Sequence, residues 1–154
     1  MGGNIILIGF MGCGKSTLGK QLAKEQSMTF VDMDDEIEKN EDMSVAEIFE
    51  KHGETYFRNL ETALLKSFQS QTGLVISTGG GAPCFNDNMT TINSIGKSVY
   101  IKLSPEVLVD RLKNEKSKRP LIANLSDKEL LEFIEGKLKV RESFYLLANE
   151  IDEV

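Results

Sequence analysis

The sequence predicts an α/β fold in which a parallel β-sheet carries helices on both faces. Two observations lead to this prediction. Short apolar runs alternate with helix-like segments along the chain, and short loops join them, as in repeated β-α-β units. The runs are dominated by apolar residues, as expected for strands buried on both faces. The 154 residues suit one domain with a single core, and no repeat or linker divides them.

The first β-α-β unit is the clearest. Residues 4–8 form a continuous apolar run, which indicates a buried strand. Apolar positions then recur at helical spacing through residues 16–25. Residues 29–31 form a second strand, and an acidic run over residues 32–35 closes it. Both strands therefore end in residues with distinctive chemistry.

Two helices are expected before the third strand. Ser44 and Glu47 have the spacing of a capping box, which opens a short helix. Gly53 is expected to end that helix, because glycine is the preferred residue just past a helix C-terminus. A single apolar stripe then predicts a longer helix over residues 54–70.

The second half of the chain continues the alternation. Residues 74–77 form a third strand that leads into three glycines, residues 86–95 are weakly helical, and residues 98–101 form a fourth strand. The remaining predicted elements are a helix over residues 105–114 that begins with an N-cap and a proline, a helix over residues 126–148 that begins with a capping box, and a last strand within residues 151–154.

Composition excludes several classes of function. The formal net charge of −6 does not favour broad contact with nucleic acid or with an anionic membrane. No apolar run reaches the roughly 18 residues of a membrane span. Cys13 and Cys84 lack the spacing of a metal site, and His52 is the single histidine. We therefore expect a cytoplasmic protein whose bound anions are drawn by local clusters of Lys and Arg.

Residues 9–16 match the pattern G-x-x-x-x-G-K-[ST], with a predicted strand before them and a helix after. In such a loop, backbone N–H groups turn inward around phosphate oxygens, and the helix N-terminus adds positive potential. Lys15 would reach the transferable phosphate, and the Ser16 hydroxyl would ligate Mg²⁺. The pattern predicts nucleotide binding. Cys13 in the same loop is interpreted as a small packing residue.

Asp32 and Asp34 are predicted to lie at the end of the second strand, on one side of the chain because they are two residues apart. Carboxylates there can hold Mg²⁺ through water and accept a proton from an attacking hydroxyl. The alternative is a solvated acidic turn, since Asp35 and Glu36 extend the run. The neighbouring phosphate loop favours the functional interpretation.

Three further motifs offer groups for an anionic, hydroxyl-bearing ligand. The planar fork of Arg58 suits a carboxylate, and Glu61 three residues later can hold that fork; otherwise Arg58 is a surface residue. Three consecutive glycines at 79–81 indicate close approach of a ligand to the backbone, or else a flexible loop. The basic segment 116–120 could close over phosphates and supply Arg119, or be a solvated charge run.

Taken together, these motifs resemble the shikimate kinases, which are small P-loop enzymes of the nucleoside-monophosphate kinase type. The resemblance extends from about residue 4 to residue 148. The matching motifs, in the order in which the family has them, are residues 9–17, Asp32 with Asp34, Phe57 and Arg58 with Glu61, residues 79–81, residues 119–121, and Arg141 with Tyr145. Without the resemblance, Arg141 would be read as an ordinary surface residue.

The resemblance implies a three-layer P-loop kinase fold, with five parallel strands in the order 2-3-1-4-5. Residues 1–154 would form one kinase domain, with a lid at about 115–124 and substrate-binding helices at about 34–70. The activity implied is transfer of the ATP γ-phosphate to the 3-hydroxyl of shikimate, on the route to chorismate and the aromatic amino acids. Family members continue past the last strand with a loop that contacts adenine and a closing helix.

The resemblance also assigns roles to residues. The catalytic residues would be Lys15, Asp34 as the base, and Arg119. ATP would be bound by Gly12, Cys13, Gly14, Lys15, Ser16, Thr17, Arg119 and, under the adenine, Arg111. Shikimate would be bound by Asp34, Arg58, Gly79, Gly80, Gly81 and Arg141. Mg²⁺ would be held by Ser16 and, through water, Asp32.

Two alternatives remain open on the sequence alone. The chain could be a related small-molecule kinase, such as a gluconate kinase, although the paired aspartates and triple glycine argue against it. It could also be a nucleotide-binding module that has lost catalysis, although intact Lys15, Ser16, Asp32 and Asp34 argue against that. We expect a monomer whose partners are small-molecule substrates, without nucleic acid or membrane.

Overall fold

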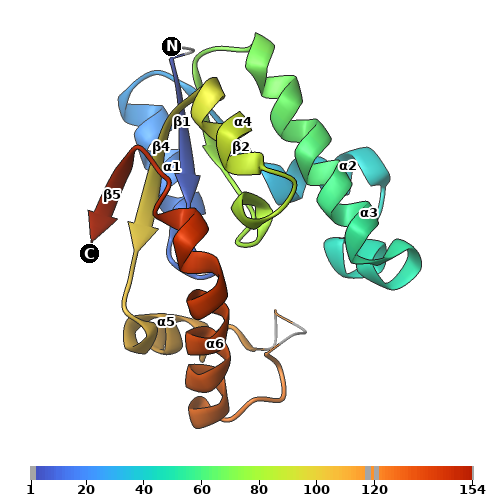
Figure 1. Cartoon of the computed structure of the whole chain (residues 1–154), viewed down its shortest axis with the longest axis vertical. Coiled ribbons are helices and arrows are strands. Elements are labelled where there is room, and N and C mark those ends of the chain that lie inside the picture. The colour runs from blue at the N-terminus through green and yellow to red at the C-terminus, as the bar shows by residue number, and fades with distance from the viewer. Residues whose placement is uncertain (1–2, 117–118, 120–121, 154) are drawn as a thin grey trace.

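A computed structural model describes residues 3–116, 119 and 122–153 of the chain (Figure 1). Its centre is one five-stranded sheet in the order β2-β3-β1-β4-β5, in which every neighbouring pair is parallel. The predicted sheet and its strand order are confirmed. The strands are β1 (Asn4–Ile8), β2 (Thr29–Asp32), β3 (Leu74–Ser77), β4 (Gly96–Lys102) and β5 (Glu150–Glu153).

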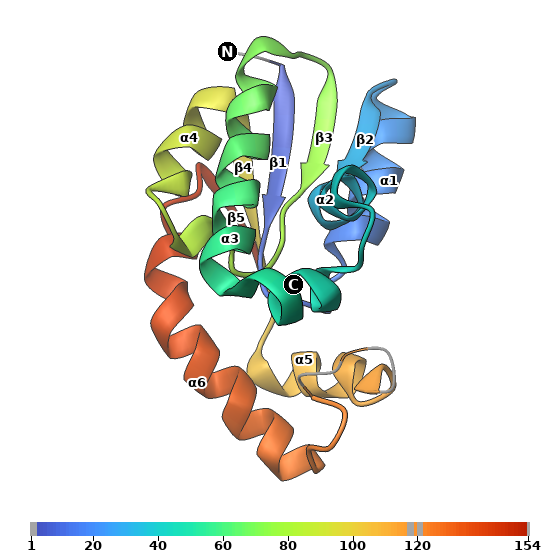
Figure 2. The same ribbon diagram turned by 90° about the vertical axis from the view of Figure 1, so that its right-hand side faces the viewer.

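Helices cover both faces of this sheet. Figure 2 shows α1 on one face and α3 and α4 on the other, while α5 and α6 extend beyond the carboxyl ends of β1 and β4. The helices are α1 (Lys15–Glu25), α2 (Met33–Glu41), α3 (Val45–Ser67), α4 (Asn88–Ile95), α5 (Pro105–Leu112) and α6 (Asp127–Tyr145), with short 3₁₀ turns at Phe68–Ser70 and Ala82–Cys84.

The alternation of side chains along β1 explains the three layers. Ile6 and Ile8 belong to the core cluster that also contains residues of α3 and α4. Leu7, between them, points to the opposite cluster, which contains Ala23 of α1. All three side chains are fully buried, so each face of the strand supports its own hydrophobic core.

The prediction that Asp34 lies at the end of a strand is wrong. β2 ends at Asp32, whose side chain caps α2 by accepting a hydrogen bond from the backbone N–H of Asp35 at 3.2 Å. Asp34 therefore lies in the first turn of α2 (Met33–Glu41), a helix that the residue pattern alone did not predict. An N-cap aspartate followed by acidic residues suits the positive end of a helix.

Other boundaries differ more modestly. Both capping boxes, at Ser44 and Ser126, are confirmed. Gly53, with φ of 84° and ψ of 173°, is non-helical and separates two helical segments that α3 joins across a kink, so the predicted end of the first segment is confirmed. Part of the predicted lid and the end of the predicted last strand, namely residues 117–118, 120–121 and 154, lie outside the described residues. Within the described part of the chain, no helix has the length and apolarity needed to cross a membrane.

Gly19 of α1 lies where a side chain has no room. A Cβ atom there would lie 2.5 Å from a ring carbon of Phe30. We expect Gly19→Ala to lower the free energy of unfolding by about 1–2 kcal/mol, although alanine favours helices. Gly136→Ala in α6 is the matched control and should raise it by about 0.5–1 kcal/mol, since no described atom lies within 4 Å of that position. Urea unfolding measures both; a Gly19→Ala variant as stable as Gly136→Ala would contradict this packing.

Candidate active site

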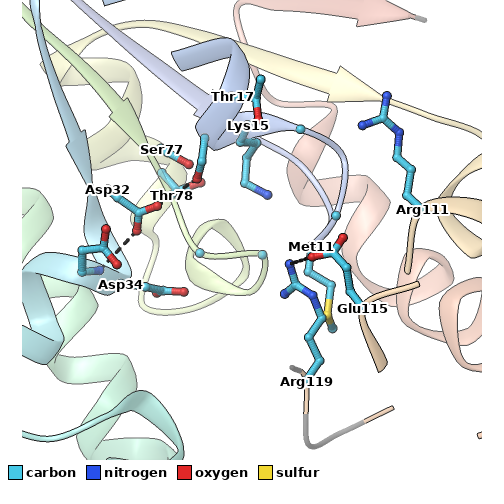
Figure 3. Close-up of a pocket in the computed structure, with 16 residues that line it drawn as sticks. Met11, Lys15, Thr17, Asp32, Asp34, Ser77, Thr78, Arg111, Glu115 and Arg119 are labelled. Atoms are coloured by element: carbon cyan, nitrogen blue, oxygen red, sulfur yellow. Dashed lines mark hydrogen bonds and ion pairs between the residues drawn. The ribbon is translucent and has the colours of Figure 1, made fainter. Parts of the chain in front are cut away.

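A cavity of about 520 Å³ opens at the carboxyl ends of β1, β2 and β3 (Figure 3). Open α/β sheets bind their ligands at this edge. The predicted site residues that line it are Gly12, Gly14, Lys15, Ser16, Thr17, Asp32, Asp34, Gly79, Gly80, Arg111 and Arg119. Four predicted residues do not line it: Cys13, Arg58, Gly81 and Arg141.

The phosphate loop connects β1 to α1. Gly12 and Gly14 have φ of 79° and 93°, a region that favours glycine, and Gly14 is the N-cap of α1. The side chain of Lys15 folds into the loop, where its ammonium donates to the carbonyl oxygens of Gly9 at 2.6 Å and Phe10 at 3.1 Å. Cys13 is buried in the core beside this loop, as expected of a packing residue.

A hydrogen bond joins the side chains of Ser16 and Asp32. The Ser16 hydroxyl donates to the Asp32 carboxylate at 2.9 Å, which joins the first turn of α1 to the end of β2. A hydroxyl and a carboxylate are hard oxygen donors, the type that Mg²⁺ prefers. Mg²⁺ usually takes one or two carboxylates together with phosphate oxygens, so this pair beside a phosphate loop fits the ion.

Asp34 is an acidic residue of the cavity wall whose pKa is strongly raised. Its Oδ1 atom is buried and has no hydrogen-bond partner among the described residues. Burial raises the pKa of Asp34 to about 6; the charge of Asp32 adds to the rise, and Lys15 opposes it. A carboxyl group with a pKa near neutrality suits general base catalysis.

Arg58 on α3 is held in place by several contacts. Its Nη1 donates to Glu61 at 2.9 Å, as predicted, and its Nη2 lies 3.1 Å from Glu54. The guanidinium lies over the ring of Phe85, 4.3 Å from the centroid. Burial raises the pKa of Glu61 to about 7, although the positive charge of Arg58 lowers it in part. The guanidinium faces Gly81, where a Cβ atom would lie 2.7 Å from its nitrogens.

Arg141 approaches the same glycine segment from α6. A Cβ atom on Gly80 would lie 3.3 Å from Nη1 of Arg141. The guanidinium also lies over the ring of Phe10, 5.7 Å from the centroid. Arg58 and Arg141 therefore face consecutive glycines, Gly81 and Gly80, from two different helices. They are 83 positions apart, so no local pattern pairs them, and only the family resemblance had assigned both to one ligand.

The opposite side of the cavity carries Arg111 and Arg119. Figure 3 shows Asp32 and Asp34 on one side, Arg119 with Glu115 on the other, and Lys15 between them. Arg119 lies 3.4 Å from Glu115. Its Nε is buried without a partner among the described residues. Arg111 approaches the phosphate loop, where a Cβ atom on Gly14 would lie 3.3 Å from it.

Some cavity residues were not predicted from the sequence: Met11, Asp35, Ser77, Thr78 and Glu115. Glu115 could have been found, because it lies four residues before Arg119 and such pairs meet on one face of a helical turn. Ser77 ends the buried strand β3 and Thr78 follows it, directly before the glycines, which is also a recognisable signal. Met11 carries no chemical signal in the sequence.

The fold and this site define the class of the protein. A strand, a phosphate loop and a helix are followed by an acidic pair at the junction of the second strand and the next helix, and arginines are directed at the same edge of the parallel sheet. This combination is that of a P-loop kinase, an enzyme that transfers phosphoryl groups.

Comparison with known proteins identifies the family. A family model described as shikimate kinase matches residues 11–151. A shikimate kinase of Bacteroides fragilis is 46% identical over 147 residues, which cover 96% of this chain and 82% of the relative. The chain belongs to the shikimate kinase family, whose members are phosphotransferases.

Solved structures agree with this family. The crystal structure of shikimate kinase from Bacteroides thetaiotaomicron is 43% identical, covers 97% of this chain and 85% of its own, and has a TM-score of 0.94. Shikimate kinase from Acinetobacter baumannii in complex with shikimate is 36% identical, with coverages of 98% and 83% and a TM-score of 0.86. A gluconokinase from Sinorhizobium meliloti, at 15% identity and TM-score 0.57, shares only the fold. The shikimate kinase prediction is thus favoured over the gluconate kinase alternative.

The raised pKa of Asp34 leads to a prediction about stability. The folded protein holds this proton more tightly than the unfolded chain, since the pKa rises from 3.8 to about 6. The group therefore favours folding at low pH, and its contribution is lost as pH rises from about 4 through 6.

We expect Asp34→Asn to be more stable than the wild type by on the order of 2 kcal/mol at pH 8, and the difference to shrink towards zero near pH 4. Urea unfolding in EDTA at several pH values measures this difference. A stability difference that does not change with pH would contradict the assigned cause.

Proposed function

We propose that this chain transfers the γ-phosphate of ATP to the 3-hydroxyl of shikimate, with the residues of the cavity in the following roles. The observation that carries the proposal is the arrangement around Gly79–Gly81. The phosphate loop lines the cavity together with Asp34, Gly79 and Gly80. Two arginines that do not line it approach the same glycine segment from α3 and α6. An acceptor with a carboxylate and several hydroxyls would find a partner for each group here.

The shikimate carboxylate would bind to Arg58 and Arg141. Glu54 and Glu61 both contact Arg58, but they differ in exposure: the Glu54 side chain is 55% exposed and that of Glu61 is 1% exposed. An incoming carboxylate can take the place of Glu54, while buried Glu61 keeps the guanidinium oriented. The backbone N–H groups of the glycines would donate hydrogen bonds to the same ligand.

Asp34 would bind the shikimate hydroxyls and act as the base. As the 3-hydroxyl oxygen attacks the γ-phosphorus, the bond from phosphorus to the β,γ-bridging oxygen of ATP breaks and ADP leaves. The hydroxyl proton would pass to the Asp34 carboxylate. Its raised pKa matches this task, because a base with a pKa near the working pH combines availability with basicity.

The phosphate loop and the arginines would bind ATP. Backbone N–H groups of residues 12–17 would hold the phosphates, and Lys15 would exchange its contacts with loop carbonyls for the transferred phosphoryl group. Arg119 would stabilise the charge on that group, and Arg111 would lie under the adenine. Mg²⁺, held by Ser16 and through water by Asp32, would neutralise charge on the phosphates.

The proposal also covers domain organisation, oligomeric state, partners and location. We propose one kinase domain over residues 1–154, with a lid at about 115–124 and substrate-binding helices at about 34–70. We also propose that the protein is a monomer. The net charge of −6 supports small-molecule substrates and argues against nucleic acid or a membrane surface as a partner. ATP as a substrate supports a cytoplasmic location.

An ADP-release assay with Mg²⁺ and ATP tests the proposed function. ADP release should rise when shikimate is added and should not respond to gluconate at the same concentration. Release that does not increase with shikimate would refute the proposal, and stimulation by gluconate would favour the related kinase instead.

Asp34→Asn tests the assignment of the base. We expect turnover to fall by at least about 100-fold, because the amide cannot accept the proton. ATP affinity should stay near the wild-type value, as measured by calorimetry. Asp42→Asn is the matched control: it makes the same change on an exposed residue at the other end of α2, outside the cavity lining, and should keep most activity. Near-normal turnover by Asp34→Asn would show that another group is the base.

A further inference from the structure

The glycine segment after β3, residues 79–81, and the residue after it accept hydrogen bonds from side chains of other elements. Three consecutive glycines are costly to order, because glycine loses more backbone freedom on folding than any other residue. Two contacts offset this cost here. The Tyr145 hydroxyl donates to the Gly80 carbonyl oxygen at 2.5 Å, and the side-chain amide of Asn88 donates to the Ala82 carbonyl oxygen at 2.8 Å. Both side chains are fully buried.

Tyr145 is the last residue of α6 and lies one helical turn after Arg141. Residues four apart lie on the same face of a helix, so both side chains extend from α6 towards the same segment. Arg141 approaches Gly80 through its guanidinium, and Tyr145 holds the carbonyl of that residue. Both side chains therefore reach from α6 to the same residue, Gly80.

Gly80 also contacts the phosphate loop. A Cβ atom at this position would lie 3.4 Å from the backbone nitrogen of Met11, nearly as close as the 3.3 Å to Arg141. Gly80 thus lies close both to the loop that would hold the nucleotide and to the arginine that would hold the acceptor. Movement of this residue would change the spacing between the two substrates.

The tyrosine itself is rigidly held. Its ring packs on that of Tyr100, with centroids 5.0 Å apart, and the Tyr100 hydroxyl donates to Glu142 of α6. Burial raises the pKa of Tyr145, so its hydroxyl keeps its proton and remains a donor. Tyr100 and Tyr145 therefore form a pair in which one hydroxyl ties α6 to β4 and the other ties α6 to the glycine segment.

We propose that Tyr145 is a positioning residue, whose hydroxyl holds Gly80 and Arg141 at a fixed distance from the phosphate loop and so aligns the acceptor with the phosphoryl group. This inference rests on the proposed function and adds a residue to it. Tyr145 acts through Gly80 and Arg141, not by contact with the reacting atoms.

The variant Tyr145→Phe removes the hydroxyl and keeps the ring. Tyr100→Phe is the matched control, because it removes the other hydroxyl of the same stacked pair. For Tyr145→Phe we expect kcat/KM for shikimate to fall about fivefold to tenfold, the effect of one lost hydrogen bond. The KM for ATP and the ATP hydrolysis without shikimate should stay within about twofold. Tyr100→Phe should keep kcat/KM for shikimate close to the wild type.

Hydrogen exchange of the ligand-free protein provides a readout that needs no substrate. The Ala82 N–H donates to the Gly79 carbonyl at 3.1 Å and should exchange faster in Tyr145→Phe, by about fivefold, but not in Tyr100→Phe. Unchanged exchange in Tyr145→Phe, or equal losses of kcat/KM in both variants, would overturn the proposal. Faster exchange with an unchanged kcat/KM for shikimate would also overturn it, because the hydrogen bond from Tyr145 to Gly80 would then not align the substrates. If shikimate does not stimulate ADP release by the wild type, the proposed function is refuted. The exchange result would still decide whether the Tyr145 hydroxyl holds the glycine segment in place.

Discussion

The backbone from Gly79 to Gly81 carries no Cβ atoms, and charged side chains from three helices occupy the space that this leaves. Glu61 of α3 and Asp34 of α2 approach Gly79, Arg141 of α6 approaches Gly80, and Arg58 of α3 approaches Gly81. Any side chain at these positions would push the charged groups away. The consecutive glycines therefore allow close approach by the protein's own charged side chains, which gather around this segment beside the cavity.

Charge distribution follows from the same arrangement. The chain carries a net charge of −6, yet basic side chains gather around the cavity: Lys15, Arg58, Arg111, Arg119 and Arg141. Several of these already contact internal oxygen atoms, such as the Gly9 carbonyl for Lys15 and the Glu115 carboxylate for Arg119. Under the proposed function, anionic groups of the substrates would replace these acceptors at cations that are already in place. A site preorganised in this way loses little free energy to rearrangement on binding.

Sequence patterns over a few residues predicted helix starts and nearby ion pairs. They did not predict contacts between residues that are far apart in the sequence. The capping boxes and the Arg58–Glu61 pair depend on residues three apart, so the sequence alone was sufficient. Strand order depends on pairing between distant segments, and it came only from family resemblance. Asp34 was misplaced because an acidic run after a strand can be either a turn or a capped helix start. The bond between Tyr145 and Gly80 joins residues 65 positions apart, and no local pattern indicates it.

A crystal structure of the protein with shikimate, Mg²⁺ and a non-hydrolysable ATP analogue would examine the whole arrangement at once. The account predicts that the shikimate carboxylate lies between the guanidinium groups of Arg58 and Arg141. The 3-hydroxyl should then lie within hydrogen-bond distance of the Asp34 carboxylate and face the γ-phosphate. A carboxylate bound away from both arginines, or a 3-hydroxyl beyond the reach of Asp34, would contradict the account.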